Sequence, residues 1–329
     1  MKKKDNKSLD RIAEVLLGAI RRENEAFNYY YGSSEKSPYP ETKSLLLQLA
    51  DEERKHRMIL IKELQTLKGF LKRGKKGQEF IGKDEISYHL PDELPYRKIE
   101  AIRGLDVAAV TFPSQLTGGD HFDTFPVKGS SQAAFLFDVA GHGLGATELK
   151  GQARAIFDRF KEGYLEAGVS SDVFSPSSVS RMLNQKLWED CQKKGAFLTS
   201  FYALFQPENK KLSYVSAGHE PPILLRKGKS QPEIIDSDLL IGVDKEKSYP
   251  GVKVDIASGD IFILFSDGLV ETFAYRDIEF ERGELTDVIQ QHRDLSAEKM
   301  IEKICEFVKS KLKGKTLTDE FTLAVFKIK

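Results

Sequence analysis

The sequence has little of several features that mark special classes of protein. Its two cysteines, Cys191 and Cys305, are too few and too far apart for a disulfide framework or a cysteine-based zinc site. Its 50 basic and 50 acidic residues cancel, so net charge favours neither nucleic acid nor a membrane surface as the main partner. No apolar run approaches the roughly 20 residues that span a bilayer, and residues 1–10 lack the apolar core of a signal peptide. We therefore expect a soluble, cytoplasmic protein.

What the sequence does contain begins with two amphipathic stretches. Apolar residues recur at spacings of three and four over 9–31 and again over 41–71, with glycine and prolines between the stretches. This pattern predicts an antiparallel helical hairpin within residues 1–71. Such a hairpin buries only one face, so we expect it to pair with a second copy in a four-helix bundle or with the rest of the chain. Residues 72–95 begin with a basic, glycine-rich run and predict a linker.

Residues 96–329 have a different pattern from the hairpin. Short apolar runs are separated by turn residues, and helical periodicity is confined to 146–166, 177–193 and 296–312. Clustered strands with helices grouped between them favour an α+β domain over a parallel β-α-β sheet. We therefore expect a β-sandwich flanked by helices.

Four aspartates in this second domain lie beside the ends of apolar runs, mostly next to glycines. They are Asp120 after Gly118 and Gly119, Asp138 before Gly141 and Gly143, Asp267 before Gly268, and Asp319 before the last apolar run. Aspartate before glycine is usually an ordinary turn residue. Four strand-end carboxylates in equivalent settings, however, provide the oxygen ligands that hard divalent cations prefer, and they predict one metal centre.

Five motifs around these aspartates resemble those of PPM-type metal-dependent serine/threonine phosphatases. In the family's order they are Gly118-Gly119-Asp120-His121-Phe122-Asp123, Asp138-Val139-Ala140-Gly141-His142-Gly143, Ala217-Gly218-His219-Glu220-Pro221-Pro222, Ser266-Asp267-Gly268-Leu269-Val270-Glu271 and Thr318-Asp319-Glu320-Phe321-Thr322. The resemblance covers about 96–329. It is nearest to the bacterial branch that includes the sporulation phosphatase and the regulators of stress sigma factors.

The resemblance implies a mechanism and a set of catalytic residues. Asp138 would bridge two Mn²⁺ or Mg²⁺ ions, the Val139 carbonyl would add a ligand, and Asp267 and Asp319 would bind one ion. Asp120 would bind a cation directly or hold one of its waters. A water bridging the two cations would attack phosphoserine or phosphothreonine on a regulatory protein, which the branch implies is an anti-sigma-factor antagonist.

Other residues of the motifs have two interpretations each. The glycines at 118, 119, 141, 143 and 268 let the backbone approach the cations, although plain turns also need glycine. His142 either donates a proton to the leaving oxygen or stabilises its turn, and His219 is better explained as structural. Glu320 replaces the family's usual second aspartate. No arginine clearly matches the phosphate-binding arginine of animal members.

The hairpin carries polar residues at the spacing of a metal site. Glu23 lies in the first helical stretch, and Glu53 and His56 are three residues apart on one face of the second. These motifs resemble the first helix pair of rubrerythrin-like proteins, whose second pair is missing here and would be supplied by a homodimer. The resemblance implies iron at Glu23, Glu53 and His56, whereas a solvated face on a dimerising or sensing module explains the same residues.

Three functions are compatible with this combination of domains. The first is a phosphatase regulated by the hairpin. The second is an iron- or oxygen-sensing di-iron protein with the phosphatase as its output, which iron analysis of the purified dimer would decide. The third is a non-catalytic scaffold, against which the retention of all four aspartates argues.

Overall fold

The structure is a computed structural model of the 329-residue chain. It describes residues 89–112, 120–127, 130–139, 144–166, 171–194 and 196–329 (except 231, 234, 236, 276–277, 279–281 and 318–319), together with scattered positions between 12 and 60. Most of the predicted linker lies outside the described residues.

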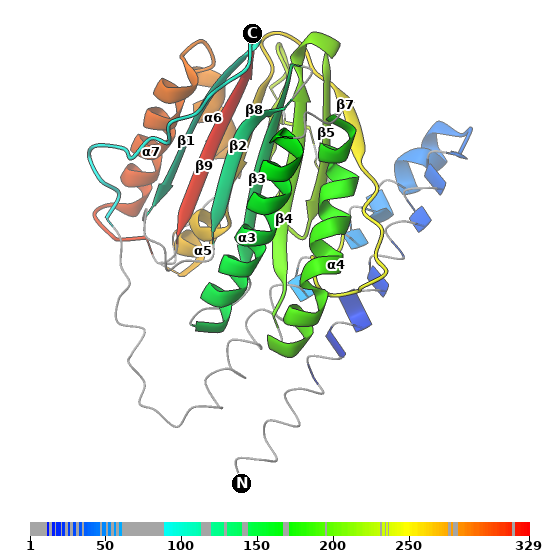
Figure 1. The fold of residues 1–329 in the computed structure, drawn as a ribbon. Coiled ribbons are helices and arrows are strands. Elements are labelled where there is room, and N and C mark those ends of the chain that lie inside the picture. The colour runs from blue at the N-terminus through cyan, green and yellow to red at the C-terminus, as the bar shows by residue number, and fades with distance from the viewer. Residues whose placement is uncertain are drawn as a thin grey trace.

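Two antiparallel sheets stack at the centre of the molecule (Figure 1). The four-stranded sheet has the order β1 (Leu105–Phe112), β9 (Phe321–Ile328), β8 (Ile261–Phe265) and β6 (Ile223–Leu225). The five-stranded sheet has the order β2 (His121–Val127), β3 (Ser131–Val139), β4 (Leu198–Gln206), β5 (Lys211–Ala217) and β7 (Val252–Asp255).

Helices cover the outer face of each sheet. On the five-stranded sheet lie α3 (Leu144–Glu166) and α4 (Pro176–Lys194), joined through the short helix η1 (Ser171–Phe174) (Figure 1). Against the four-stranded sheet packs α7 (Ala297–Leu312), preceded by α5 (Gly268–Tyr275) and α6 (Arg282–Gln291); η2 (Pro207–Asn209) connects β4 to β5. The predicted α+β sandwich flanked by helices is confirmed. The helices α5 and α6 were not predicted, because both are too short to show a clear helical period.

The layered arrangement explains why the strands have continuous apolar runs rather than alternating ones. Every residue of β8, and all of β4 except its last, is buried, since one face meets the other sheet and the opposite face meets helices. Between the sheets, the ring of Phe205 stacks on that of Phe326 with centroids 4.6 Å apart. Burying an aromatic side chain of this kind stabilises the fold by roughly 1.5–3 kcal/mol.

The ends of α7 show how local sequence sets a helix. Ser296 caps its start, because the Ser296 Oγ accepts the backbone N–H of Lys299 at 3.3 Å. Lys313 adopts a left-handed conformation at its end, with φ of 48°, and donates its N–H to the Lys309 carbonyl. The buried face between these caps places Met300, Ile304 and other apolar residues against the sheet.

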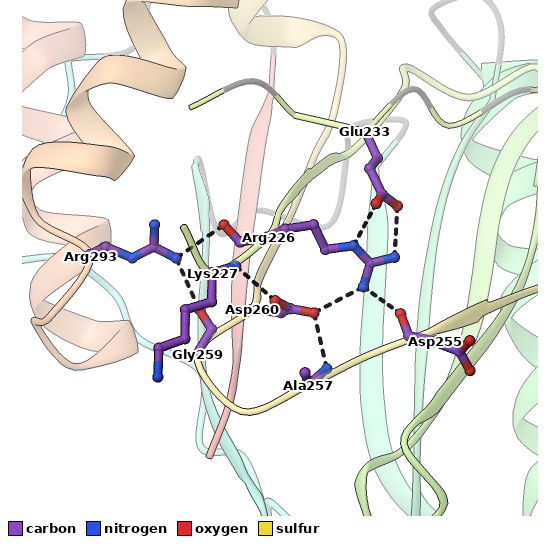
Figure 2. A network of polar contacts seen from close by, with 8 residues as sticks. All are labelled: Arg226, Lys227, Glu233, Asp255, Ala257, Gly259, Asp260 and Arg293. Atoms are coloured by element: carbon purple, nitrogen blue, oxygen red, sulfur yellow. Dashed lines mark hydrogen bonds and ion pairs between the residues drawn. The ribbon is translucent and has the colours of Figure 1, made fainter. Parts of the chain in front are cut away.

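A network of charged residues holds the turn that leads into β8 (Figure 2). The Arg226 guanidinium donates from Nε and Nη2 to the two carboxylate oxygens of Glu233, each at 2.7 Å, and from Nη1 to Asp260 Oδ2 at 2.9 Å. Arg293, just beyond α6, donates to the Gly259 carbonyl at 3.0 Å. This network lies at the opposite end of β8 from Asp267.

The described positions of the N-terminal hairpin are helical, apart from 37–39, and part of the hairpin packs on the sandwich. Ile20 is fully buried in one apolar cluster with Phe197, Leu239, Leu240 and Val243. The hairpin was expected to pack either on a second copy or on the rest of the chain. The second of these contacts is present in the structure. Among the described helices, none is both long and apolar enough to cross a membrane.

Candidate metal centre

Asp138 and Asp120 lie next to each other at one edge of the five-stranded sheet. Asp138 is the penultimate residue of β3, and the residue before it, Phe137, pairs with His121, the first residue of β2. Because the strands are antiparallel, continuing this register by one residue places Asp120 opposite Asp138. Leu136 belongs to the core between the sheets, so by strand alternation Asp138 is also on the side that faces the other sheet.

Asp120 joins the two sheets at this edge. Its backbone N–H donates to Glu320 Oε2 at 2.8 Å, and its Oδ2 accepts the hydroxyl of Thr322 at 2.7 Å. Thr322, in β9, accepts the Ser266 N–H at its carbonyl and donates its own N–H to Ser266 Oγ, each at 3.0 Å. Asp267 is the next residue of the chain. The ends of β2, β3, β8 and β9 therefore meet at one edge, which carries Asp120, Asp138 and Asp267.

The carboxylates at this edge are largely shielded from solvent. Asp120 and Glu320 are each only 6% exposed, and Lys150 of α3 places its Nζ 3.8 Å from Glu320 Oε2. Buried carboxylates are stable as anions only beside compensating positive charge and hydrogen-bond donors. The potential metal ligands at this edge are carboxylate oxygen atoms. Hard divalent cations such as Mg²⁺ and Mn²⁺ prefer oxygen ligands, so the residues present fit these cations.

The predicted site residues of the sandwich fall into two groups in the structure. Asp120, Asp138, Val139, Asp267 and Gly268 share the edge, with Val139 buried at the end of β3 and Gly268 opening α5. Register and hydrogen bonds bring them together. Among the described residues of this edge, no three histidine, cysteine or acidic side chains have ligand atoms within 4.8 Å of one another. Gly118, Gly119, Gly141, His142, Gly143 and Asp319 lie outside the described residues.

Two residues at the edge were missed by sequence reasoning. Thr322 lies in the fifth motif, so a place near the metal site could have been predicted for it from the sequence. The structure shows that its hydroxyl donates to Asp120. Lys150 belongs to no motif. Only the packing of α3 on the sheet places its ammonium group beside Glu320.

The turn after β5 has a structural role. Gly218 has a φ of +68°, and a Cβ there would lie 2.6 Å from Leu240 Cγ, so the close packing requires glycine. His219 is 2% exposed, and its Nδ1 lies 2.7 Å from the Glu220 carbonyl oxygen. The histidine therefore has a local hydrogen-bonding partner in the turn.

The hairpin brings Glu23 of the first helical stretch together with Glu53 and His56, which the i,i+3 spacing had placed on one face of the second. One potential ligand atom from each lies within 4.8 Å of the others. His56 Nδ1 is 3.7 Å from Glu23 Oε2 and 3.6 Å from Glu53 Oε2. A hydrogen bond with the Glu53 carboxyl group, followed by burial, raises the pKa of Glu23. The two carboxyl groups are thus close enough to share a proton or a cation.

Comparison with known proteins decides the family. Residues 128–329, more than half of the chain, match the family described as Stage II sporulation protein E (SpoIIE). The chain belongs to the SpoIIE family. Residues 14–99 separately match the rubrerythrin family. Both resemblances expected from the motifs are confirmed, and the sandwich of this SpoIIE-family chain is a PP2C-type serine/threonine phosphatase domain.

Individual relatives agree with this assignment. Phosphoserine phosphatase RsbU of Bacillus subtilis is 28% identical over 268 residues, which cover 81% of this chain and 74% of RsbU. The PP2C domain and regulatory fragment of SpoIIE from Bacillus subtilis has a TM-score of 0.52 and 18% identity, over 70% of this chain and 64% of that one. RsbX in complex with magnesium has a TM-score of 0.51 and 13% identity, over 72% of this chain and all of RsbX. The two structures support the fold alone.

Proposed function

We propose that this SpoIIE-family phosphatase hydrolyses phosphoserine or phosphothreonine on a regulatory protein, with two Mn²⁺ or Mg²⁺ ions at the edge described above. The observation that carries the proposal is the junction of Asp120 with Glu320 and Thr322, which brings strand ends from both sheets to one acidic edge. RsbU is named as a phosphoserine phosphatase, and RsbX was solved with magnesium. An anti-sigma-factor antagonist is the substrate that the branch favours.

The residues of the edge have separate tasks in this proposal. Asp138, Asp267, Asp319 and the Val139 carbonyl would hold the cations, and Asp120 would bind one directly or orient its water. When bound, the cations would lower the pKa of a water and offset charge on the phosphoryl oxygens. The Thr322 hydroxyl fixes the orientation of the Asp120 carboxylate.

Removal of metal tests the proposal directly. The full-length chain supplied with Mn²⁺ is expected to release phosphate from a phosphoserine peptide, and excess EDTA should abolish that release until Mn²⁺ is restored. The reason is that the protein groups at the edge are carboxylates, which are poor nucleophiles for a phosphate ester and themselves repel it. Phosphate release that survives EDTA unchanged would contradict the proposal.

The hairpin is the proposed regulator of this site. Ile20 shares an apolar cluster with Phe197, which precedes β4 by one residue. Within β4, Leu198 pairs with Val139 and Thr199 pairs with Asp138. Phe197 is thus only two residues from Thr199, the partner of Asp138. A change in how the hairpin packs on Phe197 would therefore shift the strand pair that positions Asp138.

A homodimer through the hairpin is the proposed assembly. Several large apolar side chains of the hairpin face solvent, although helices usually cover such groups. They are Ile12, Val15, Tyr29, Tyr39, Leu45 and Ile59, which are 46–70% exposed. A second hairpin would cover these side chains and supply the helix pair that the rubrerythrin resemblance lacks.

Metal sensing by the hairpin is the second candidate function, and the trio of Glu23, Glu53 and His56 favours it. Glu23 and Ile20 are three residues apart in the first helical stretch, so they lie on neighbouring positions of one helix face. A cation that draws Glu23 towards Glu53 and His56 would change the packing of Ile20 on the sandwich.

Iron content and phosphatase activity test this coupling together. The purified dimer is expected to contain iron, Glu53→Ala should lose it, and iron-loaded and iron-free wild type should differ several-fold in phosphate release. Ile20→Glu buries a charge in the apolar cluster, so it should keep iron but lose the difference in activity. Ser44→Glu is the control, since Ser44 is an exposed helical residue of the hairpin and is not one of the apolar residues proposed to form the dimer. An iron-free dimer, or equal activity in both forms, would reject metal sensing.

A further inference from the structure

Basic side chains converge beside the metal-binding edge from two parts of the chain. Lys150, Arg154 and Lys161 are spaced by four and seven residues, which places them on one face of α3. Contacts tie this face to β2, because Lys161 Nζ lies 2.6 Å from Asp123 Oδ2. From the segment before β1, Arg97 donates Nη1 to the Phe122 carbonyl at 2.6 Å.

Contacts of α3 on both sides of Arg154 place this helix face beside the edge. One turn before Arg154, Lys150 Nζ lies 3.8 Å from Glu320 Oε2, and two turns after Arg154, Lys161 contacts Asp123. Arg154 therefore lies along α3 between the acidic edge and the contact with β2.

A groove runs along the edge strand β2 within this positive region. It has a volume of about 280 Å³ and is lined by Arg97, Lys98 and Ile99 on one side and by Phe122, Asp123 and Thr124 on the other. Phe122 is two residues from Asp120, a distance of about 7 Å along a strand. The groove therefore begins two residues along β2 from the proposed site of hydrolysis, where the residues next to a bound phosphoserine would lie.

The lining of the groove carries more positive than negative charge, because Arg97 and Lys98 face a single acid, Asp123. Among the described residues, Asp158 pairs with Arg154 at 3.4 Å, and both Asp123 and Asp158 pair with Lys161. Lys150 faces Glu320 of the metal edge. Arg154 is nevertheless 53% exposed, and Arg97 and Lys98 are exposed on the rim.

We propose that this cationic groove binds an acidic segment beside the phosphorylated residue of the substrate, with Arg97 and Arg154 as its specificity-determining residues. The inference rests on the proposed phosphatase function and names the substrate class for the same site. Complementary charge favours an acidic partner and disfavours a basic one, and the guanidinium groups match carboxylates in geometry. These residues select the protein substrate and take no part in the chemical step.

Peptide discrimination tests the proposal in the full-length chain. A short phosphoserine peptide flanked by glutamates is compared with one flanked by glutamines, and with p-nitrophenyl phosphate, in the presence of Mn²⁺. Arg97→Ala and Arg154→Ala should each raise KM for the glutamate peptide about three- to tenfold, since exposed and partly buried charge contacts are of that strength. Both should change kcat/KM for p-nitrophenyl phosphate by less than about twofold, because that ester is too small to reach the groove.

Arg159→Ala is the matched control for the α3 variant. Arg159 is also exposed on α3, but it lies five residues from Arg154 and on the opposite face from Lys150, where its Nε donates to the Ala155 carbonyl. Arg159→Ala should leave the ratio of kcat/KM between the glutamate and glutamine peptides unchanged. If Arg97→Ala and Arg154→Ala lowered kcat/KM equally for all three substrates, or did not lower it for the glutamate peptide, the proposal would be overturned.

Binding separates failure of this proposal from failure of the phosphatase function. Fluorescence anisotropy with the labelled glutamate and glutamine peptides measures Kd without requiring turnover. If no substrate is hydrolysed, the phosphatase proposal fails, while tighter binding of the glutamate peptide that Arg97→Ala and Arg154→Ala remove still supports the groove. Equal Kd values for the two peptides in wild type would overturn the groove whatever the activity.

Discussion

Asp138→Asn is expected to reduce phosphate release by roughly a thousandfold, about the loss seen when an active site loses a group that stabilises developing charge. Asparagine has nearly the same shape as aspartate but no charge, so it cannot hold two cations. The β-ladder around the position, in which Asp138 pairs with Thr199, should remain intact. Asp267→Asn should have an effect in the same direction.

The measurement is steady-state phosphate release over a range of Mn²⁺ concentrations, together with thermal unfolding of each variant. Asp255→Asn is the control, because Asp255 also ends a strand of the five-stranded sheet but lies on the other edge strand, β7, and its side chain is 81% exposed. The control should keep wild-type activity. A folded Asp138→Asn protein that keeps wild-type activity would rule out the proposed metal centre.

Asp260→Ala is expected to destabilise the sandwich by about 3 kcal/mol, the cost of removing one partner from a buried, hydrogen-bonded ion pair. Asp260 is 3% exposed and accepts hydrogen bonds from Arg226 Nη1 at 2.9 Å, the Lys227 N–H at 2.9 Å and the Ala257 N–H at 3.0 Å (Figure 2). Alanine would leave these donors without the carboxylate and loosen the turn that leads into β8.

Thermal and urea unfolding of full-length protein measure this effect. A loss of 3 kcal/mol corresponds to a melting temperature lower by roughly 10 °C in a domain of this size. Asp255→Ala is again the control, since Asp255 pairs with Lys211 on the surface and solvent screens that pair. A melting temperature within a degree of wild type for Asp260→Ala would show that the network of Figure 2 does not stabilise the fold.

Motif order predicted the sandwich and its acidic edge because strand ends and glycine turns have strong local signals. In the structure β2 begins directly after Asp120, Asp138 is the penultimate residue of β3, and β8 ends two residues before Asp267. In the hairpin, i,i+3 spacing on a helix already brought Glu53 and His56 together, whereas the approach of Glu23 was expected only from the rubrerythrin-like resemblance.

Contacts between distant segments had no comparable signal. The approach of Lys150 to Glu320 depends on how α3 packs on the sheet, and the burial of Ile20 depends on where the hairpin meets Phe197. Amphipathic periodicity says that one face of a helix is covered, but it does not say what covers it. The short helices α5 and α6 were missed because tertiary packing, more than their own period, stabilises them.

By itself the sequence determined the residue chemistry of this protein: oxygen ligands at strand ends, a Glu-x-x-His helix, and the motifs of the SpoIIE family. Only the tertiary structure decided which of these groups share a surface, which side chains are buried, and that cations of α3 and Arg97 flank the acidic edge. The physical reason is range: turns and helical spacing are set by neighbours along the chain, whereas burial and charge pairing are set by groups that meet only after the sheets have stacked.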